Sequence, residues 1–434
     1  MNLPMLATVT GSLSITEQQA TEAITLPELV SVGQDGAGDS LKLDTLSRLA
    51  LVSAPKLGSV PGNIAMNRCG QARDPVQSPL TLAFTTLRSI GGSFDLNELP
   101  SLKKLDGIPL LASVGGALRM TSLSVLSAFE SSLLQTVGGR IAIDRNDALT
   151  NVTLTGLSSA SGISITQAPA LTAILLLPLA TLGNDQGYSL YCQSLPVLAT
   201  VSAPNLVTST GAIYIDMVGA ELGPANETLL SFGALKTVGG LHVERTSRVV
   251  SLAGFSALTT INGYFYVATN SALTSLTMPS LTTVTDSLRV WSNEALSTVA
   301  LPSFTSAGTG FSGSLGFDYL PALTSISVPK IERMPSTLFI FYVGDSPAIS
   351  SPLALDFGSL VQVGESLEIN DAPHLRDLSG FARVVAVGGT LMFDRDRELA
   401  SAVLPQLASR RSAADRSERG ARERVLSCAR ERRW

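Results

Sequence analysis

Two short acidic segments hold the residues best suited to acid–base chemistry. They are "IDRND", which contains Asp144, Arg145 and Asp147, and "FDRDRE", which contains Asp394, Arg395 and Asp396. A pair of carboxylates can protonate a leaving group and activate water, which is the chemistry of enzymes that cleave polysaccharides. Aspartate is also a common turn former, and each segment directly follows a predicted strand, so turn formation accounts for both. We therefore predict no catalytic residues.

Residues that could bind a metal or form a disulfide are few and scattered. The chain has three cysteines and two histidines, namely Cys69, Cys192, Cys428, His242 and His374. They lack the close spacing of a zinc site or a disulfide framework. Cys192 occupies an apolar position in "GYSLYC", so we expect a buried free thiol. Cys69 is expected in a loop too distant for a disulfide with it. We predict neither a metal nor a cofactor.

Two N-glycosylation sequons are present, at Asn151 in "NVT" and at Asn226 in "NET". Asn226 falls in a predicted loop, where a glycan would be accommodated. Such matches arise easily by chance in a Thr-rich chain. They are compatible with secretion and do not establish it.

The composition argues against some classes of partner. Only 15% of the 434 residues are charged, and the formal net charge is -5. Nine arginines and four acidic residues lie between Ser409 and Trp434, so the remaining chain carries 21 basic and 31 acidic residues. An acidic body does not favour nucleic acid. The most apolar run, Leu171 to Leu182, is too short to span a membrane, and we expect neither a signal peptide nor an anchor in this chain.

A repeat of 22 to 30 residues must position all of these side chains. "NSALTSLTMPSL" from Asn270 returns 23 residues later as "NEALSTVALPSF" from Asn293. The unit reads loosely N-x-x-L-x-x-L-x-L-P-x-L-x-x-V-x-G-x-L-x-V. The first apolar residue of the closing L-x-V occurs sixteen times, at Leu13, Leu41, Ile64, Phe94, Leu118, Ile141, Ile163, Leu190, Ile213, Leu241, Phe265, Leu288, Leu315, Leu338, Leu367 and Leu391. This period indicates a solenoid.

Within each unit, apolar residues alternate with polar ones, which predicts short strands. Leu288 and Val290 are expected to point inward. The prediction is an all-β, parallel β-helix or solenoid of about sixteen short coils, each advancing about 4.8 Å. We expect one continuous solenoid over residues 1–406, with breaks between lobes near 67–80, 217–230 and 305–314 as the alternative. Residues 407–434 are expected to form an irregular Arg-rich tail, disordered or a short helix.

Aromatic residues gather at the outward position between the two inward residues of the closing strand. These residues, with two neighbours on the same face, are Tyr191, Tyr214, His242, Tyr264, Tyr266, Trp291 and Phe339. Stacking between strands would stabilise the sheet. An exposed strip would instead offer contact anchors for a protein or a glycan. Outward threonines are expected not to form the regular ladder that an ice- or surface-binding solenoid needs.

The segments "ALTSLTMPSLTTVTDSLRV", "LKTVGGLHV" and "LVQVGESLEI" resemble the receptor L-domain superfamily. That family has leucine-rich-like repeats and includes the ligand-binding L domains of insulin- and EGF-type receptors and the GPI-anchored cell-wall proteins of fungi. The resemblance implies a right-handed β-helix, an extracellular or cell-surface location and no catalytic residues.

Two function classes follow from these observations. The first is a non-enzymatic, secreted or cell-surface solenoid that binds a protein or glycan partner, or serves a structural or adhesive role. The alternative is a polysaccharide-active parallel β-helix enzyme, either a lyase or a hydrolase. The aromatic strip favours the first, and a carboxylate cluster within one site would favour the second.

Overall fold

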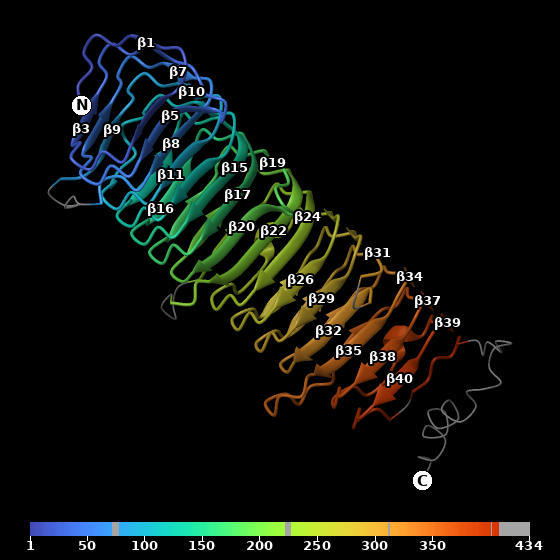
Figure 1. The fold of residues 1–434 in the computed structure, drawn as a ribbon. Helices are drawn as coiled ribbons and strands as arrows, with labels where there is room; N and C mark the ends of the chain where they lie inside the picture. The colour runs from blue at the N-terminus through green and yellow to red at the C-terminus, as the bar shows by residue number, and fades with distance from the viewer. Residues whose placement is uncertain (72–77, 222–226, 311–312, 401, 408–434) are drawn as a thin grey trace, which may run out of the picture. The chain divides into compact units, whose positions relative to one another are not determined.

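The computed structural model describes residues 1–71, 78–221, 227–310, 313–400 and 402–407. These residues form stacked coils of short parallel strands (Figure 1). The chain divides into two compact units, Met1–Val249 and Val250–Trp434, and each is described by itself. Apart from Leu407, the predicted Arg-rich tail lies outside the described residues.

The closing strands confirm the predicted solenoid and its coil count. Those of the first unit are β2 (Leu13–Thr16), β5 (Asp39–Asp44), β8 (Asn63–Asn67), β11 (Phe94–Asn97), β13 (Leu118–Thr121), β15 (Thr136–Asp144), β17 (Ser159–Thr166), β20 (Tyr188–Leu195), β22 (Thr208–Val218) and β24 (Thr237–Glu244). Those of the second unit are β26 (Phe265–Ala268), β29 (Leu288–Trp291), β32 (Leu315–Leu320), β35 (Leu338–Val343), β38 (Leu367–Asn370) and β40 (Leu391–Asp394). Equivalent repeat positions pair directly, as in Ile141 with Ile163 and Leu288 with Leu315.

Shorter strands form two further sides of most coils. One side of the first unit consists of β3 (Ala23–Thr25), β6 (Leu51–Ser53), β9 (Thr81–Ala83), β14 (Ala128–Ser131), β16 (Asn151–Leu154), β18 (Ala173–Leu175), β21 (Thr200–Ser202) and β23 (Leu229–Ser231). Its counterpart in the second unit is β27 (Ser275–Thr277), β30 (Thr298–Ala300), β33 (Ser325–Ser327) and β36 (Ala354–Asp356).

In four coils the third side is the first part of β15, β17, β22 or β24. In other coils it consists of two-residue strands. They are β1 (Thr8–Val9), β4 (Ser31–Val32), β7 (Ser59–Val60), β10 (Ser89–Ile90), β12 (Ser113–Val114) and β19 (Thr181–Leu182), then β25 (Thr260–Ile261), β28 (Thr283–Val284), β31 (Ser306–Ala307), β34 (Arg333–Met334), β37 (Gln362–Val363) and β39 (Ala386–Val387). Within the described ranges, the helical elements are the 3₁₀ turns η1 (Ala253–Phe255) and η2 (Ser379–Phe381).

Inward side chains of successive coils stack into the core. Leu288 and Val290 are fully buried, as predicted. Cys192 is also buried and free, and burial raises the pKa of its thiol to about 12. Cys69 lies outside the strands, two residues after β8, and is free, as predicted; its side chain is buried, and burial raises the pKa of its thiol to about 11. Cys428 lies outside the described residues.

Each closing strand ends at a corner residue with a left-handed backbone. The sixteen corner residues are Glu17, Thr45, Arg68, Glu98, Ser122, Arg145, Gln167, Ser194, Met217, Arg245, Thr269, Ser292, Tyr319, Tyr342, Asp371 and Arg395, with φ between 50° and 57°. Such a conformation costs an ordinary residue about 1 kcal/mol or more. Hydrogen bonds to neighbouring coils offset it, as where the amide of Thr45 donates to the carbonyl of Asn67. The corners therefore project aligned side chains from coil to coil.

A row of hydroxyl side chains lies along the third side of the first unit. Eight residues pair in consecutive register along the third side of the first unit: Ser59, Ser89, Ser113, Thr136, Ser159, Thr181, Thr208 and Thr237. The row mixes four serines with four threonines, so the expectation that outward threonines form no regular ladder stays a prediction. Serine and threonine both occur there and the coils differ in length, so this row is visible only once the strands are paired.

Candidate functional site

The predicted aromatic column exists in the first unit as a stack of rings. Tyr191 on β20, Tyr214 on β22 and His242 on β24 are register partners. The ring centroids of Tyr191 and Tyr214 are 4.8 Å apart with planes 10° apart, and those of Tyr214 and His242 are 4.3 Å apart with planes 25° apart. Tyr188 packs edge-on against both tyrosines, with ring centroids 5.1 Å and 5.6 Å away. The rings therefore face one another along the column.

This arrangement limits what the column can bind. A ring that stacks on its neighbours turns its edge rather than its face to a ligand. The Tyr191 hydroxyl donates to Gln193 Oε1 at 2.9 Å. Burial raises the pKa of Tyr191, and burial followed by the charge of Asp216 raises the pKa of Tyr214 to about 12. These hydroxyls stay protonated near neutral pH and act through hydrogen bonds.

An ion-pair network lies beside the column. Asp216 on β22 is fully buried. Arg245 donates to both carboxylate oxygens of Asp216, through Nε at 2.7 Å and a terminal nitrogen at 2.6 Å. Gln193 Nε2 also donates to the Asp216 carboxylate, at 2.8 Å. Two-point contact of this kind compensates a buried carboxylate for its lost hydration. The network fixes the side chain of corner residue Arg245.

The aromatic residues of the second unit form a different cluster. Tyr264 and Tyr266 stack with centroids 4.8 Å apart, and Trp291 meets Tyr266 edge-on at 5.8 Å. The Arg289 guanidinium lies 4.8 Å from the centroid of Trp291 and 5.5 Å from that of Phe339. One face of the Trp291 ring is therefore covered by a cation.

Phe339 corrects the prediction of an exposed strip. Its side chain is buried, with 8% exposed. A Cβ added to Gly316, its register partner on β32, would lie 2.1 Å from the Phe339 ring. The ring therefore folds over the glycine instead of pointing into solvent. Glycine in the neighbouring coil is what permits this, and the outward position alone did not reveal it.

Tyr319 and Tyr342 form a stacked pair outside the predicted aromatic column. Both are corner residues, their ring centroids are 4.7 Å apart, and the planes differ by 11°. Tyr319 is 53% exposed. Both lie two residues after the closing L-x-V, in "LGFDY" and "LFIFY". This shared place is the sequence signal that could have found them, once the corner is recognised as an outward position.

The corners of five successive coils in the first unit enclose a shallow groove of about 550 Å³. We call it the corner groove. Its lining residues are Arg145, Asp147, Gln167, Pro169, Ser194, Pro196, Met217, Ala220 and Arg245. Prolines, alanine and methionine supply apolar surface, and polar side chains lie among them. Arg145 pairs with Asp144 at 2.9 Å, so neither arginine of the groove carries an unopposed charge.

The two acidic segments lie in different units. Asp144 and Asp147 belong to the first unit, and Asp144 accepts a hydrogen bond from Thr166 at 2.6 Å. Asp394 and Asp396 belong to the second, where Asp394 pairs with Arg395 at 3.4 Å. Within the described ranges, no group of three or more His, Cys, Asp or Glu side chains could hold a metal ion.

Of the two sequons, one can be placed. Asn151 begins β16, and its Nδ2, the atom a glycan would occupy, donates to Glu130 Oε1 at 2.6 Å. Glycosylation there would leave Nδ2 a single N–H and place the glycan beside this hydrogen bond. Asn226 lies outside the described residues.

The chain matches no model of a protein family, no curated protein and no solved structure. Among the described residues, no helix has the length and apolar character of a membrane span.

Proposed function

We propose that this protein is a non-enzymatic solenoid that binds a neutral glycan chain along the corner groove, in a secreted or cell-surface setting. The observation that carries the proposal is the groove itself, which runs across five coils and combines apolar surface with hydrogen-bonding side chains. Four steps of about 4.8 Å separate Arg145 from Arg245, so the groove suits an extended polymer about 19 Å long.

The chemistry of the groove favours sugars over charged polymers. Sugar rings have one relatively apolar face, which would pack on Pro169, Pro196 and Met217. Their hydroxyls would exchange hydrogen bonds with Asp147, Gln167 and Ser194. Because both arginines are already paired with aspartates, a polyanion would gain little there. The resemblance to receptor L domains supports the same setting.

The rings of the tyrosine column stack on one another, so they would offer edges rather than faces to a glycan. Arg245 belongs both to the groove and to the Asp216 network. We propose that Tyr191, Tyr214 and His242 hold this wall of the groove in place. In the second unit, Tyr264, Tyr266 and Trp291 remain candidate contacts of their own.

The test is a binding assay against immobilised neutral polysaccharides, namely a β-glucan, chitin and a mannan. A Gln167→Ala, Met217→Ala double variant should bind about tenfold more weakly than the wild type, or about 1.4 kcal/mol. A Thr45→Ala, Glu98→Ala variant alters two corner residues outside the groove and should bind normally. Failure of the wild type to bind any of the three polysaccharides, or equal binding by the groove variant, would overturn the proposal.

A further inference from the structure

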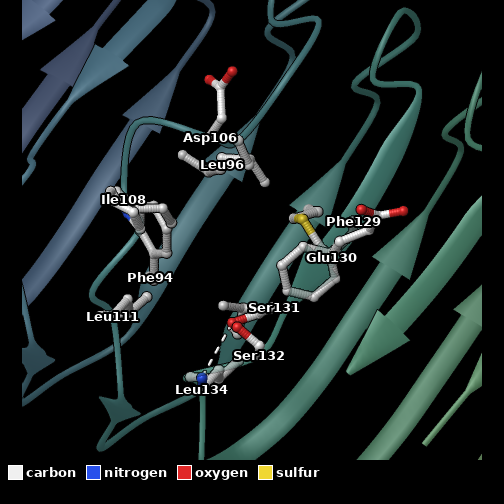
Figure 2. Close-up of a pocket in the computed structure, with 14 residues that line it drawn as sticks. Phe94, Leu96, Asp106, Ile108, Leu111, Phe129, Glu130, Ser131, Ser132 and Leu134 are labelled. Carbon is white, nitrogen blue, oxygen red and sulfur yellow. Dashed lines mark hydrogen bonds between the residues drawn. The ribbon is translucent and has the colours of Figure 1, made fainter. Parts of the chain in front are cut away.

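An interior cavity of about 230 Å³ lies in the first unit, between the coils that close with β11, β13 and β15 (Figure 2). Its walls are mixed: Phe94 and Leu96 from β11 and Phe129 from β14 supply apolar surface, and Asp106, Glu130, Ser131 and Ser132 supply a nearly equal polar share. Figure 2 shows these side chains around the space, with Ser131 and Ser132 beside Leu134. The corner groove shares none of these residues.

The cavity arises from two substitutions in one inward row. In most coils of this unit, the residue three positions before a buried leucine fills this part of the core. These residues are Leu26, Ala54, Phe84, Leu154, Leu176, Ala203 and Phe232, none more than 1% exposed. Each alanine of the row is flanked by a Leu and a Phe in the adjacent coils. The two successive coils at the cavity have Ile108 and Ser131 instead, and both are only half-buried.

The coil containing Ile108 also lacks a strand on this side. It reads "LDGIPLL", and the second unit has the same form in "LAGFSAL" and "LSGFARV". There Phe255 and Phe381 occupy the position of Ile108 and are fully buried. Ile108 is smaller than phenylalanine, so it leaves space that those coils fill. Between β9 and β14 this side has the isolated bridge of Leu80 and Leu102 and single backbone hydrogen bonds, such as that from the amide of Phe84 to the carbonyl of Gly107 at 2.8 Å.

We infer that this cavity binds a small neutral molecule with an apolar body, an aromatic ring or a short alkyl chain, and one hydroxyl group. An engineered apolar cavity of about 150 Å³ accommodates benzene, so this one has room for a ring with a substituent. The Ser131 hydroxyl accepts the amide proton of Leu134 at 3.1 Å and can donate its own proton to the ligand oxygen. Asp106 and Glu130 at the rim make the entrance acidic, which disfavours a carboxylate.

The test compares matched probes by calorimetry and by thermal shift of the full chain. Benzyl alcohol and 1-hexanol should bind saturably and raise the unfolding temperature. Benzoate and hexanoate, which differ in carrying a negative charge, should bind at least about tenfold more weakly, since the charge faces an acidic rim and no Lys or Arg is among the lining residues. Absence of saturable binding by both alcohols would overturn the inference.

Two variants locate the binding. Ile108→Phe introduces the residue found in the equivalent coils of the second unit, and Ser131→Leu introduces the residue found at Leu154 in the next coil. Each fills the cavity, so each should raise the unfolding temperature without ligand and abolish the shift with benzyl alcohol. If one fails to fold, the other still decides. Leu176→Met, a volume-conserving change further along the same row, should leave binding intact. Normal binding by a folded, cavity-filled variant would place the ligand elsewhere and overturn the inference.

Discussion

At the scale of single residues, the inward positions of the closing strand tolerate no charge. Leu288 is fully buried between register partners Phe265 and Leu315. We expect Leu288→Asp to cost about 4 kcal/mol or more, or to prevent folding, because it buries an unpaired carboxylate. Thr277→Asp, at an exposed position of β27, is the control and should change stability by less than about 0.5 kcal/mol. Urea unfolding measures both. Equal stability of the two variants would mean that the inward register is wrong.

Asp396 makes stability depend on pH. Burial, reinforced by the charges of Asp371 and Asp394, raises the pKa of Asp396 to about 7 from an ordinary 3.8. The folded state therefore keeps a proton that the unfolded state loses. The stabilisation is complete below about pH 4 and disappears as pH rises through about 7.

Replacing Asp396 by asparagine should remove this dependence. Since the side chain is partly exposed, we expect Asp396→Asn to gain only about 1–2 kcal/mol at pH 8, with the difference shrinking towards pH 4. Asp377 is the control, because hydrogen bonds from Ser379 lower the pKa of its carboxyl. Asp377→Asn should therefore give no gain at pH 8. Urea unfolding at pH 4 and pH 8 measures both, and an Asp396→Asn gain independent of pH would contradict the expectation.

At the scale of elements, glycine controls how closely the coils approach. Gly115 follows β12, and a Cβ added there would lie 2.2 Å from the carbonyl oxygen of Gly91 in the preceding coil. We expect Gly115→Ala to destabilise the protein by about 2–3 kcal/mol, because backbone atoms must move apart. Gly58, just before β7, has nothing within 4 Å of an added Cβ. Gly58→Ala should therefore be neutral or slightly stabilising. Thermal unfolding distinguishes them, and similar melting temperatures would contradict the close approach.

At the scale of a whole unit, stacking makes energetic coupling short-ranged. Ile174 on β18 and Val201 on β21 are fully buried register partners in adjacent coils, whereas Ile24 on β3 lies several coils away from both. In double-variant cycles with alanine, Ile174 and Val201 should couple by about 0.5–3 kcal/mol. Ile24 and Val201 should be additive within about 0.5 kcal/mol, because a solenoid coil contacts its nearest neighbours. Strong coupling of the distant pair would show that the unit does not behave as a stack.

Much of the fold was predictable from the sequence, and the candidate site was predictable only in part. The inward positions repeat because each side chain packs on the side chain at the same position in the next coil. Leu288, Val290 and Cys192 could therefore be placed from periodicity alone. The column of Tyr191, Tyr214 and His242 followed from the same count. The orientation of the rings did not follow, because it depends on which residue occupies the paired position in the neighbouring coil. Phe339 folds over Gly316, and Tyr191 packs against Tyr188 and Tyr214.

The sequence by itself determined a parallel β-solenoid of about sixteen coils, its register and its core, since these depend on a repeated hydrophobic pattern. The tertiary structure alone decided which outward residues share a surface. Coils of 22 to 30 residues bring Ser59 beside Ser89 and gather Arg145, Met217 and Arg245 into one groove, although no fixed spacing connects them. It also decided where the core is incomplete. Ile108 and Ser131 are unremarkable in sequence, and they leave a cavity only because stacking places them in adjacent coils, where neither compensates for the other.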